Sequence, residues 1–188
     1  MARTAITLEQ RLEAPVSQVY RAFTNETDLR GWLCDAAMAH PAKGGRIHLW
    51  WTSGYYATGA YRKLAADQEI EFTWQGRGDP RETRVSITLR PEGVGTQLSL
   101  THEKLGTGKK WTETVEAIRR GWEQGLENLQ SVLETGRDLR LTRRPMLGIY
   151  PNALTAEARE RLGVPVEKGI LIGNVVEGMG AQAAGLQE

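Results

Sequence analysis

The chain has 188 residues, of which 40% are hydrophobic, and a formal net charge of +1 from 24 Lys and Arg against 23 Asp and Glu. This balance gives no electrostatic case for binding nucleic acid or an anionic membrane, and we expect neither as a partner. A single cysteine excludes an internal disulfide and is typical of a reducing compartment, so we expect a cytoplasmic location. The first residues lack the apolar run of a signal peptide, and no stretch approaches the length of a membrane span.

The chain begins with a short strand followed by two short helices. Residues 5–12 alternate apolar and polar side chains, which predicts a strand. A proline just before residues 16–24 suits the first turn of a helix there. A second helix is predicted over 29–34, with Thr27 or Asp28 as its cap.

From residue 36 the apolar residues recur with a period of two. Six further strands are predicted, at 36–40, 46–52, 55–64, 69–75, 83–90 and 96–103. Short turn signals separate them and leave little room for crossover helices, so the sheet should be largely antiparallel.

A long amphipathic helix over 112–136 follows the strands. Its apolar residues recur at steps of three and four: Val115, Ile118, Trp122, Leu126, Leu129 and Leu133. Thr112 suits the N-cap, and Gly136 can close the helix in a left-handed conformation. Such a helix needs a broad apolar surface. The predicted fold is therefore α+β, a curved antiparallel sheet of six to seven strands gripping the long helix, with two short helices after the first strand.

Four stretches resemble the START-like helix-grip superfamily (SRPBCC), and within it the domain named after the activator of the heat-shock-protein-ninety ATPase. They are EAPVSQVY at 13–20, LRGWL at 29–33, GTQLSLTH at 95–102, and Gly121-Trp122 followed by Leu126 and Leu129. The resemblance implies a cavity between helix and sheet that holds apolar ligands in relatives. It implies no particular reaction, because members include carriers, cyclases and co-chaperone domains.

The domain boundaries expected are a helix-grip domain at 1–138, a basic linker at 139–144, and a small α/β tail at 145–188. The tail resembles half of a bacterial PDZ domain: Leu147, Gly148 and Ile149 match the loop that receives a peptide carboxylate. The pattern stops at Glu188, where PDZ domains continue. We therefore expect a truncated PDZ-like segment that does not bind peptides in this form and whose strand 170–176 can pair along its edge.

Residues suited to catalysis or metal binding are scattered. The histidines have no metal-ligand spacing, so no metal site, cofactor or catalytic residue is predicted. His102 with Glu103 could act as an acid–base pair, but a strand-end histidine bonded to backbone is favoured. Cys34 is expected to be a small buried hydrophobe. Glu71 should point outward.

The ligand-binding residues expected lie on the facing inner surfaces of sheet and helix: Phe72, Trp74, Val85, Ile87, Ile118, Trp122, Leu126 and Leu129. Trp74 and Trp122 either pack together or bracket a ligand. Gly121 and Gly125 flank the helical stripe, which indicates either close contact with the short helices or volume kept open for a ligand.

The Trp50-Trp51 and Tyr55-Tyr56 pairs flank a tight hairpin. Because neighbours on a strand point to opposite faces, one Trp and one Tyr should face the core. The other two would form a contact surface for a partner or a second copy, unless the hairpin covers them itself.

These patterns favour a non-enzymatic binding module that holds a small apolar ligand, with an appended protein-interaction segment. One alternative is a chaperone-associated adaptor, like the heat-shock ATPase activators. The other is a cyclase- or hydratase-like enzyme using His102, Glu103 or Glu71.

Overall fold

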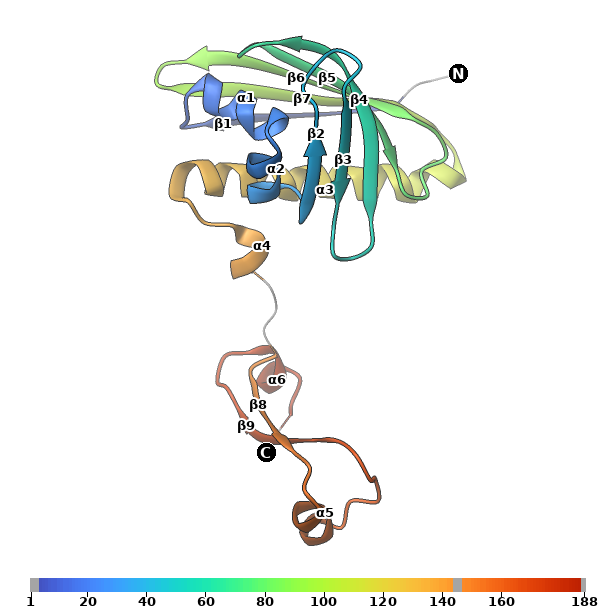
Figure 1. The fold of residues 1–188 in the computed structure, drawn as a ribbon, viewed down its shortest axis with the longest axis vertical. Helices are drawn as coiled ribbons and strands as arrows, with labels where there is room; N and C mark the ends of the chain where they lie inside the picture. Colours follow the sequence, from blue (N-terminus) through green and yellow to red (C-terminus); the bar gives the residue numbers. More distant parts are fainter. Residues whose placement is uncertain (1–3, 144–146, 187–188) are drawn as a thin grey trace. The chain divides into compact units, whose positions relative to one another are not determined.

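The computed structural model describes residues 4–143 and 147–186. They divide into two compact units, 1–142 and 143–188 (Figure 1). Within the described residues, no helix combines the length and apolar character needed to cross a bilayer.

The first unit is an α+β fold. Its elements are β1 (Thr4–Leu12), α1 (Val16–Thr24), α2 (Glu26–Trp32), β2 (Ala36–Ala39), β3 (Arg46–Trp50), β4 (Tyr56–Ala65), β5 (Glu69–Gly76), β6 (Thr83–Glu92), β7 (Gly95–Leu105), α3 (Lys109–Thr135) and α4 (Leu139–Thr142). The seven strands form one antiparallel sheet in the order β1-β7-β6-β5-β4-β3-β2. The sheet bends around α3, which lies along its concave side (Figure 1). The predicted helix-grip architecture is confirmed.

The long helix α3 begins three residues before the predicted cap. Gly108 is its N-cap, and the Thr112 hydroxyl donates to the Gly108 carbonyl instead of capping, so that prediction is wrong. The early start places Trp111 in the first turn of the helix, where it is buried and the Arg81 guanidinium lies 5.6 Å from the centroid of its ring. Gly136 ends the helix in the left-handed conformation, as predicted.

Helix α2 is capped by Asn25, not by the residues predicted. The Asn25 side chain accepts hydrogen bonds from the backbone of Thr27 and Asp28, so the helix runs earlier than expected. Asp28 instead binds the Arg21 guanidinium at 3.0 Å. A short polar side chain suits this role because it satisfies the first free N–H groups of a helix.

Aromatic side chains join the two short helices to each other and α1 to the sheet. Trp32 Nε1 donates to the Ala22 carbonyl at 2.8 Å, and its ring meets Phe23 edge-on at 5.0 Å. Tyr61 on β4 donates to the Phe23 carbonyl at 3.0 Å. Cys34 is buried beside them, and burial raises the pKa of its thiol to about 11, so it behaves as a small hydrophobe.

Helix α4, in the basic run after α3, packs on the rest of the first unit. Arg140 in α4 donates to the carbonyls of Cys34 and Arg30 at 2.8 and 2.7 Å, which satisfies one carbonyl in the last turn of α2 and one just after it. Asn128 joins α3 to the same region, since it donates to the Trp32 carbonyl and accepts from the backbone of Leu139, both at 2.7 Å. At Arg140 the structure thus differs from the solvated linker that was expected.

The second unit contains β8 (Ile149–Ala153), α5 (Ala156–Leu162), β9 (Ile170–Val175) and α6 (Gly180–Ala183). β8 and β9 pair antiparallel. In the predicted carboxylate loop, the Leu147 carbonyl accepts from Ala181, Gly148 has a positive φ of 68°, and Ile149 already belongs to β8. The PDZ-like nature of this unit stays a prediction.

Candidate functional site

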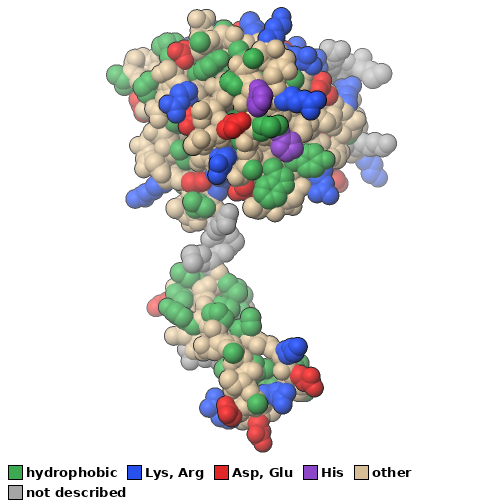
Figure 2. All heavy atoms as spheres, viewed as in Figure 1, with side chains coloured by type: hydrophobic (Ala, Val, Ile, Leu, Met, Phe, Trp, Pro, Cys, Tyr) green, Lys and Arg blue, Asp and Glu red, His purple; other side chains and the backbone are tan. Residues whose placement is uncertain are grey.

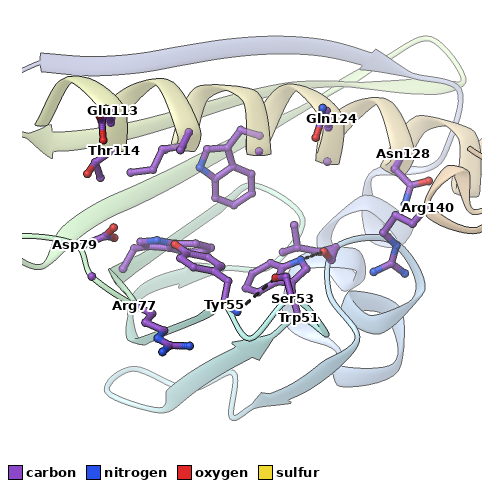
Figure 3. Close-up of a pocket in the computed structure, with 18 of the residues that line it drawn as sticks. Trp51, Ser53, Tyr55, Arg77, Asp79, Glu113, Thr114, Gln124, Asn128 and Arg140 are labelled. Carbon is purple, nitrogen blue, oxygen red and sulfur yellow. Dashed lines mark hydrogen bonds between the residues drawn. The ribbon is translucent and has the colours of Figure 1, made fainter. Parts of the chain in front are cut away.

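A cavity of about 720 Å³ lies along α3 from Glu113 to Asn128, between this helix, the β3–β4 hairpin and the 76–79 turn (Figure 3). Its apolar lining is Trp32, Leu33, Trp51, Tyr55, Trp74, Ala117, Ile118 and Trp122, with Gly78, Gly121 and Gly125. Its polar lining is Ser53, Arg77, Asp79, Glu113, Thr114, Gln124, Asn128 and Arg140. The volume falls within the range of small-molecule sites, about 300–1,000 Å³.

Trp51, Tyr55, Trp74 and Trp122 form a continuous aromatic wall in this cavity. The Trp51 ring lies 5.3 Å from Tyr55 and 6.4 Å from Trp74, and Trp74 lies 5.4 Å from Trp122. Trp51 is held in place because its Nε1 donates to the Leu33 carbonyl at 2.7 Å. Trp74 and Trp122 therefore pack on each other and still face the cavity.

The hairpin sorts its aromatic residues as the alternation predicted. Trp51 and Tyr55 turn inward and line the cavity. Trp50 and Tyr56 stay 38% and 40% exposed and lie opposite each other across β3 and β4. The sorting follows from the pleat of the two strands.

Trp50 and Tyr56 are part of a larger exposed patch on the outer face of β2, β3 and β4. Met38 and His48 face each other across β2 and β3, and His48 stacks on Tyr56 at 6.0 Å. Figure 2 shows two histidines close to hydrophobic side chains on this face. We call Met38, His48, Trp50 and Tyr56 the outer aromatic patch.

His102 lies behind the aromatic wall and is fully buried. Trp122 Nε1 donates to His102 Nδ1 at 3.0 Å, and because an indole nitrogen can only donate, the imidazole proton sits on Nε2. Nε2–H donates to the Thr83 hydroxyl at 2.7 Å, which in turn donates to the Trp74 carbonyl at 2.9 Å. Burial lowers the pKa of His102 to about 4, so the ring is neutral at pH 7. Its partners are thus side chains, not the backbone groups that were expected.

The residues of the enzymatic alternative do not meet in the cavity. His102 is absent from its lining. Glu71 points outward, as predicted, and pairs with Arg84 at 3.6 Å, and Glu103 binds the same guanidinium. Within the described residues, no group of three His, Cys, Asp or Glu side chains could hold a metal ion.

The predicted ligand-binding residues fall into two groups. Trp74, Ile118 and Trp122 line the cavity, and their role in binding stays a prediction. The others are buried in the core and take no part in the lining: Phe72, Val85, Ile87, Leu126 and Leu129. Other elements cover part of this surface, since α1 packs on β6 and β7, and the Tyr61 ring of β4 packs edge-on against Phe72 at 5.9 Å.

The two helical glycines differ in surroundings. A Cβ on Gly125 would lie 3.4 Å from the Trp32 ring and 3.6 Å from Leu33, so this glycine lies against the end of α2. A Cβ on Gly121 would meet nothing within 4 Å. Gly125 therefore allows α3 to pack closely against the end of α2, whereas Gly121 leaves open space at the cavity.

The polar groups at the two ends of the cavity differ in their hydrogen bonding and orientation (Figure 3). At one end Asn128 and Arg140 are bonded to backbone carbonyls. At the other end Asp79 points toward the space beneath α3 (Figure 3). Burial raises the pKa of Asp79 above its ordinary value, and burial together with this carboxylate raises the pKa of Tyr55 to about 12. Asp79 was not predicted as a site residue, because its only signal in the sequence is that of a turn.

A family model described as "Activator of Hsp90 ATPase homolog 1-like protein" matches residues 13–134. No curated protein matches the sequence. Among solved structures, protein CV1439 from Chromobacterium violaceum is 29% identical over 69% of this chain and 97% of its own, with a TM-score of 0.58.

Two further structures share the fold at lower identity. The Aha1 protein of Colwellia psychrerythraea, solved as a dimer in solution, is 19% identical with a TM-score of 0.64, over 71% of this chain and 98% of its own. DynU16, from the dynemicin biosynthetic locus, is 21% identical with a TM-score of 0.63 over 71% of this chain. The chain spans 48% of the length of DynU16.

Proposed function

The chain belongs to the activator of Hsp90 ATPase homolog 1-like family, and from that premise we propose that its first unit is a non-enzymatic module that binds a small apolar ligand in the cavity beneath α3. The observation that carries the proposal is the aromatic wall, which faces open space although its members already pack on one another. Affinity would come from apolar area removed from water, at about 25 cal/mol per Å² before the costs of binding.

The hydrogen bonds of His102 favour a binding function over a catalytic one. A general base must reach its substrate, whereas both ring nitrogens of His102 are engaged by Trp122 and Thr83. The histidine therefore positions the Trp122 ring at the cavity. Positioning of aromatic rings is what an apolar ligand site requires.

Titration with a neutral apolar fluorophore, N-phenyl-1-naphthylamine, tests the proposal on the full chain. We expect saturable enhancement of its fluorescence, which Trp122→Ala abolishes while circular dichroism still shows a folded chain. Trp50→Ala is the matched control, because Trp50 is half-exposed and lies outside the cavity. Unchanged binding in a folded Trp122→Ala protein would rule out this site.

A second candidate function is that of a chaperone-associated adaptor, and the outer aromatic patch favours it. Half-exposed aromatic residues on one face are suited to protein contact. An Hsp90-class ATPase whose rate rises with this chain, but not with a Trp50→Ala/Tyr56→Ala variant, would support the adaptor. A rate that the wild-type chain does not alter would dismiss it.

The second unit is proposed as the appended protein-interaction segment, in the cytoplasm like the first. Large apolar side chains stay exposed on it: Leu147, Tyr150, Leu162 and Ile170. The loop at Leu147, Gly148 and Ile149 belongs to this proposed segment, although we expect no capture of a peptide carboxylate there in this form.

A further inference from the structure

At one end of the cavity, the carboxylate of Asp79 has unused hydrogen-bond acceptor positions. Asp79 Oδ2 accepts the Gly76 N–H at 2.8 Å, and in the described part of the chain this is the one hydrogen bond of that side chain. An ionised carboxylate offers about four acceptor positions. Most of its capacity is therefore available to a group in the cavity.

The Tyr55 hydroxyl converges on the same point as Asp79. A Cβ on Gly76 would lie 2.1 Å from the Tyr55 hydroxyl and 2.5 Å from Asp79 Oδ2. Both oxygens thus lie against a residue without a side chain, and any other residue there would separate them. Glycine at 76 keeps this polar corner intact.

Trp74 adds a donor at this corner. The Trp74 side chain is only 7% exposed, and its Nε1 is buried without an acceptor in regular geometry among the described residues. The Tyr55 hydroxyl lies close enough for the indole to affect its ionisation. A buried donor without a good partner costs free energy, which a small shift of Tyr55 or an incoming oxygen would recover.

We infer that the cavity selects apolar ligands that carry a hydroxyl group, and that the Asp79 carboxylate and the Tyr55 hydroxyl bind this group. A hydroxyl can donate to the carboxylate and accept from the phenol or indole at the same time. An unsubstituted hydrocarbon leaves these groups unpaired, and a protonated amine cannot accept. A ligand carboxylate is repelled by Asp79, with Glu113 as a second carboxylate in the lining.

The cations of the lining do not offset this selection against anions. Arg77 is exposed, and its guanidinium donates to the Gly54 carbonyl at 2.9 Å at the hairpin tip. Arg140 is at the other end of the cavity and pairs with Asp138 at 2.7 Å. The half-buried carboxylate of Asp79 therefore dominates its own end.

The inference rests on the proposed ligand-binding function, and three probes with one ring system separate the two. We would measure the affinities of naphthalene, 2-naphthol and 2-naphthoate for the full chain at pH 7.5 by isothermal titration calorimetry. We expect 2-naphthol to bind about tenfold more tightly than naphthalene, as a hydrogen bond to a charged group provides. The anionic 2-naphthoate should bind more weakly than either.

Three variants assign the effect. In Asp79→Asn the advantage of 2-naphthol should fall to less than threefold and 2-naphthoate should gain affinity, and Tyr55→Phe should also lower the advantage. Asp67→Asn makes the same chemical change in the turn between β4 and β5, outside the cavity lining, and should match wild type. Should Asp79→Asn not fold, Tyr55→Phe decides.

Each outcome bears on one proposal or both. Equal binding of naphthalene and 2-naphthol by the wild-type chain would overturn the selection for hydroxyl groups and leave the apolar site standing. An advantage of 2-naphthol that survives in both Asp79→Asn and Tyr55→Phe would overturn the assignment to this corner. Failure of all three probes to bind would overturn both.

Discussion

Trp122 on α3 donates a hydrogen bond from Nε1 to Nδ1 of His102 on β7 at 3.0 Å. The bond joins the helix to the concave face of the sheet in the middle of a buried region. Because His102 also binds Thr83, which binds the Trp74 carbonyl, one polar chain positions both tryptophans of the cavity. Burial in a low dielectric makes such a chain costly to break.

Stability should fall as the pH drops from about 6.5 to about 4. The pKa of His102 is lowered from 6.5 to about 4 in the folded chain, so in this range the unfolded chain binds the proton more readily. The neutral His102 ring therefore contributes to the free energy of unfolding in full above the pKa of histidine in the unfolded chain. As the pH falls, this contribution is lost at up to about 1.4 kcal/mol per pH unit. Urea unfolding of wild type and His102→Gln at pH 7.5, 6 and 5 measures it. The same pH slope in both proteins would contradict the assignment to His102.

Trp122→Phe should destabilise the fold by about 1–3 kcal/mol, because it removes the N–H and leaves Nδ1 of His102 buried without its donor. The free energy of unfolding from urea denaturation checks this. Trp50→Phe is the control and should change it by less than about 0.5 kcal/mol, since Trp50 is half-exposed. A loss as small in Trp122→Phe as in the control would show that the indole bond adds little.

Gly121→Ala should stabilise the chain and weaken ligand binding. Alanine is favoured over glycine in a helix by about 0.5–1 kcal/mol, and its Cβ would meet no atom within 4 Å. The same methyl group would stand at the cavity lining. Thermal unfolding and N-phenyl-1-naphthylamine titration measure the two effects. Stabilisation with unchanged affinity would place Gly121 outside the ligand's reach.

Arg140→Ala should loosen the contact of α4 with the end of α2 in the first unit. The change removes the donors to the carbonyls of Arg30 and Cys34, so the free energy of unfolding should fall by about 1–3 kcal/mol. Limited proteolysis should then cut within 137–144 faster than in wild type. Arg137→Ala, at an exposed neighbouring position, is the control and should be cut at the wild-type rate. Equal rates in all three proteins would show that the contact does not hold α4.

The sequence alone was enough for the architecture. A stripe of apolar residues at steps of three and four predicts a helix with one buried face, and the period of two after residue 36 predicts strands with one buried face. These patterns are local, so they located α3 and the inner faces of β5, β6 and β7 to within a few residues. They also predicted that one Trp and one Tyr of the hairpin face inward, and the structure shows that these are Trp51 and Tyr55.

Only the tertiary structure decided which inward residues form the cavity. Phe72 and Trp74 lie on the same face of β5, yet Phe72 is covered by Tyr61 while Trp74 meets open space. Periodicity reports the side of a strand on which a residue lies, but not which distant element covers it. Asp79 shows the same limit, since a turn residue gains its place in the cavity from how β5 and α3 come together. The site is a product of packing between segments far apart in the chain, and no local pattern encodes that.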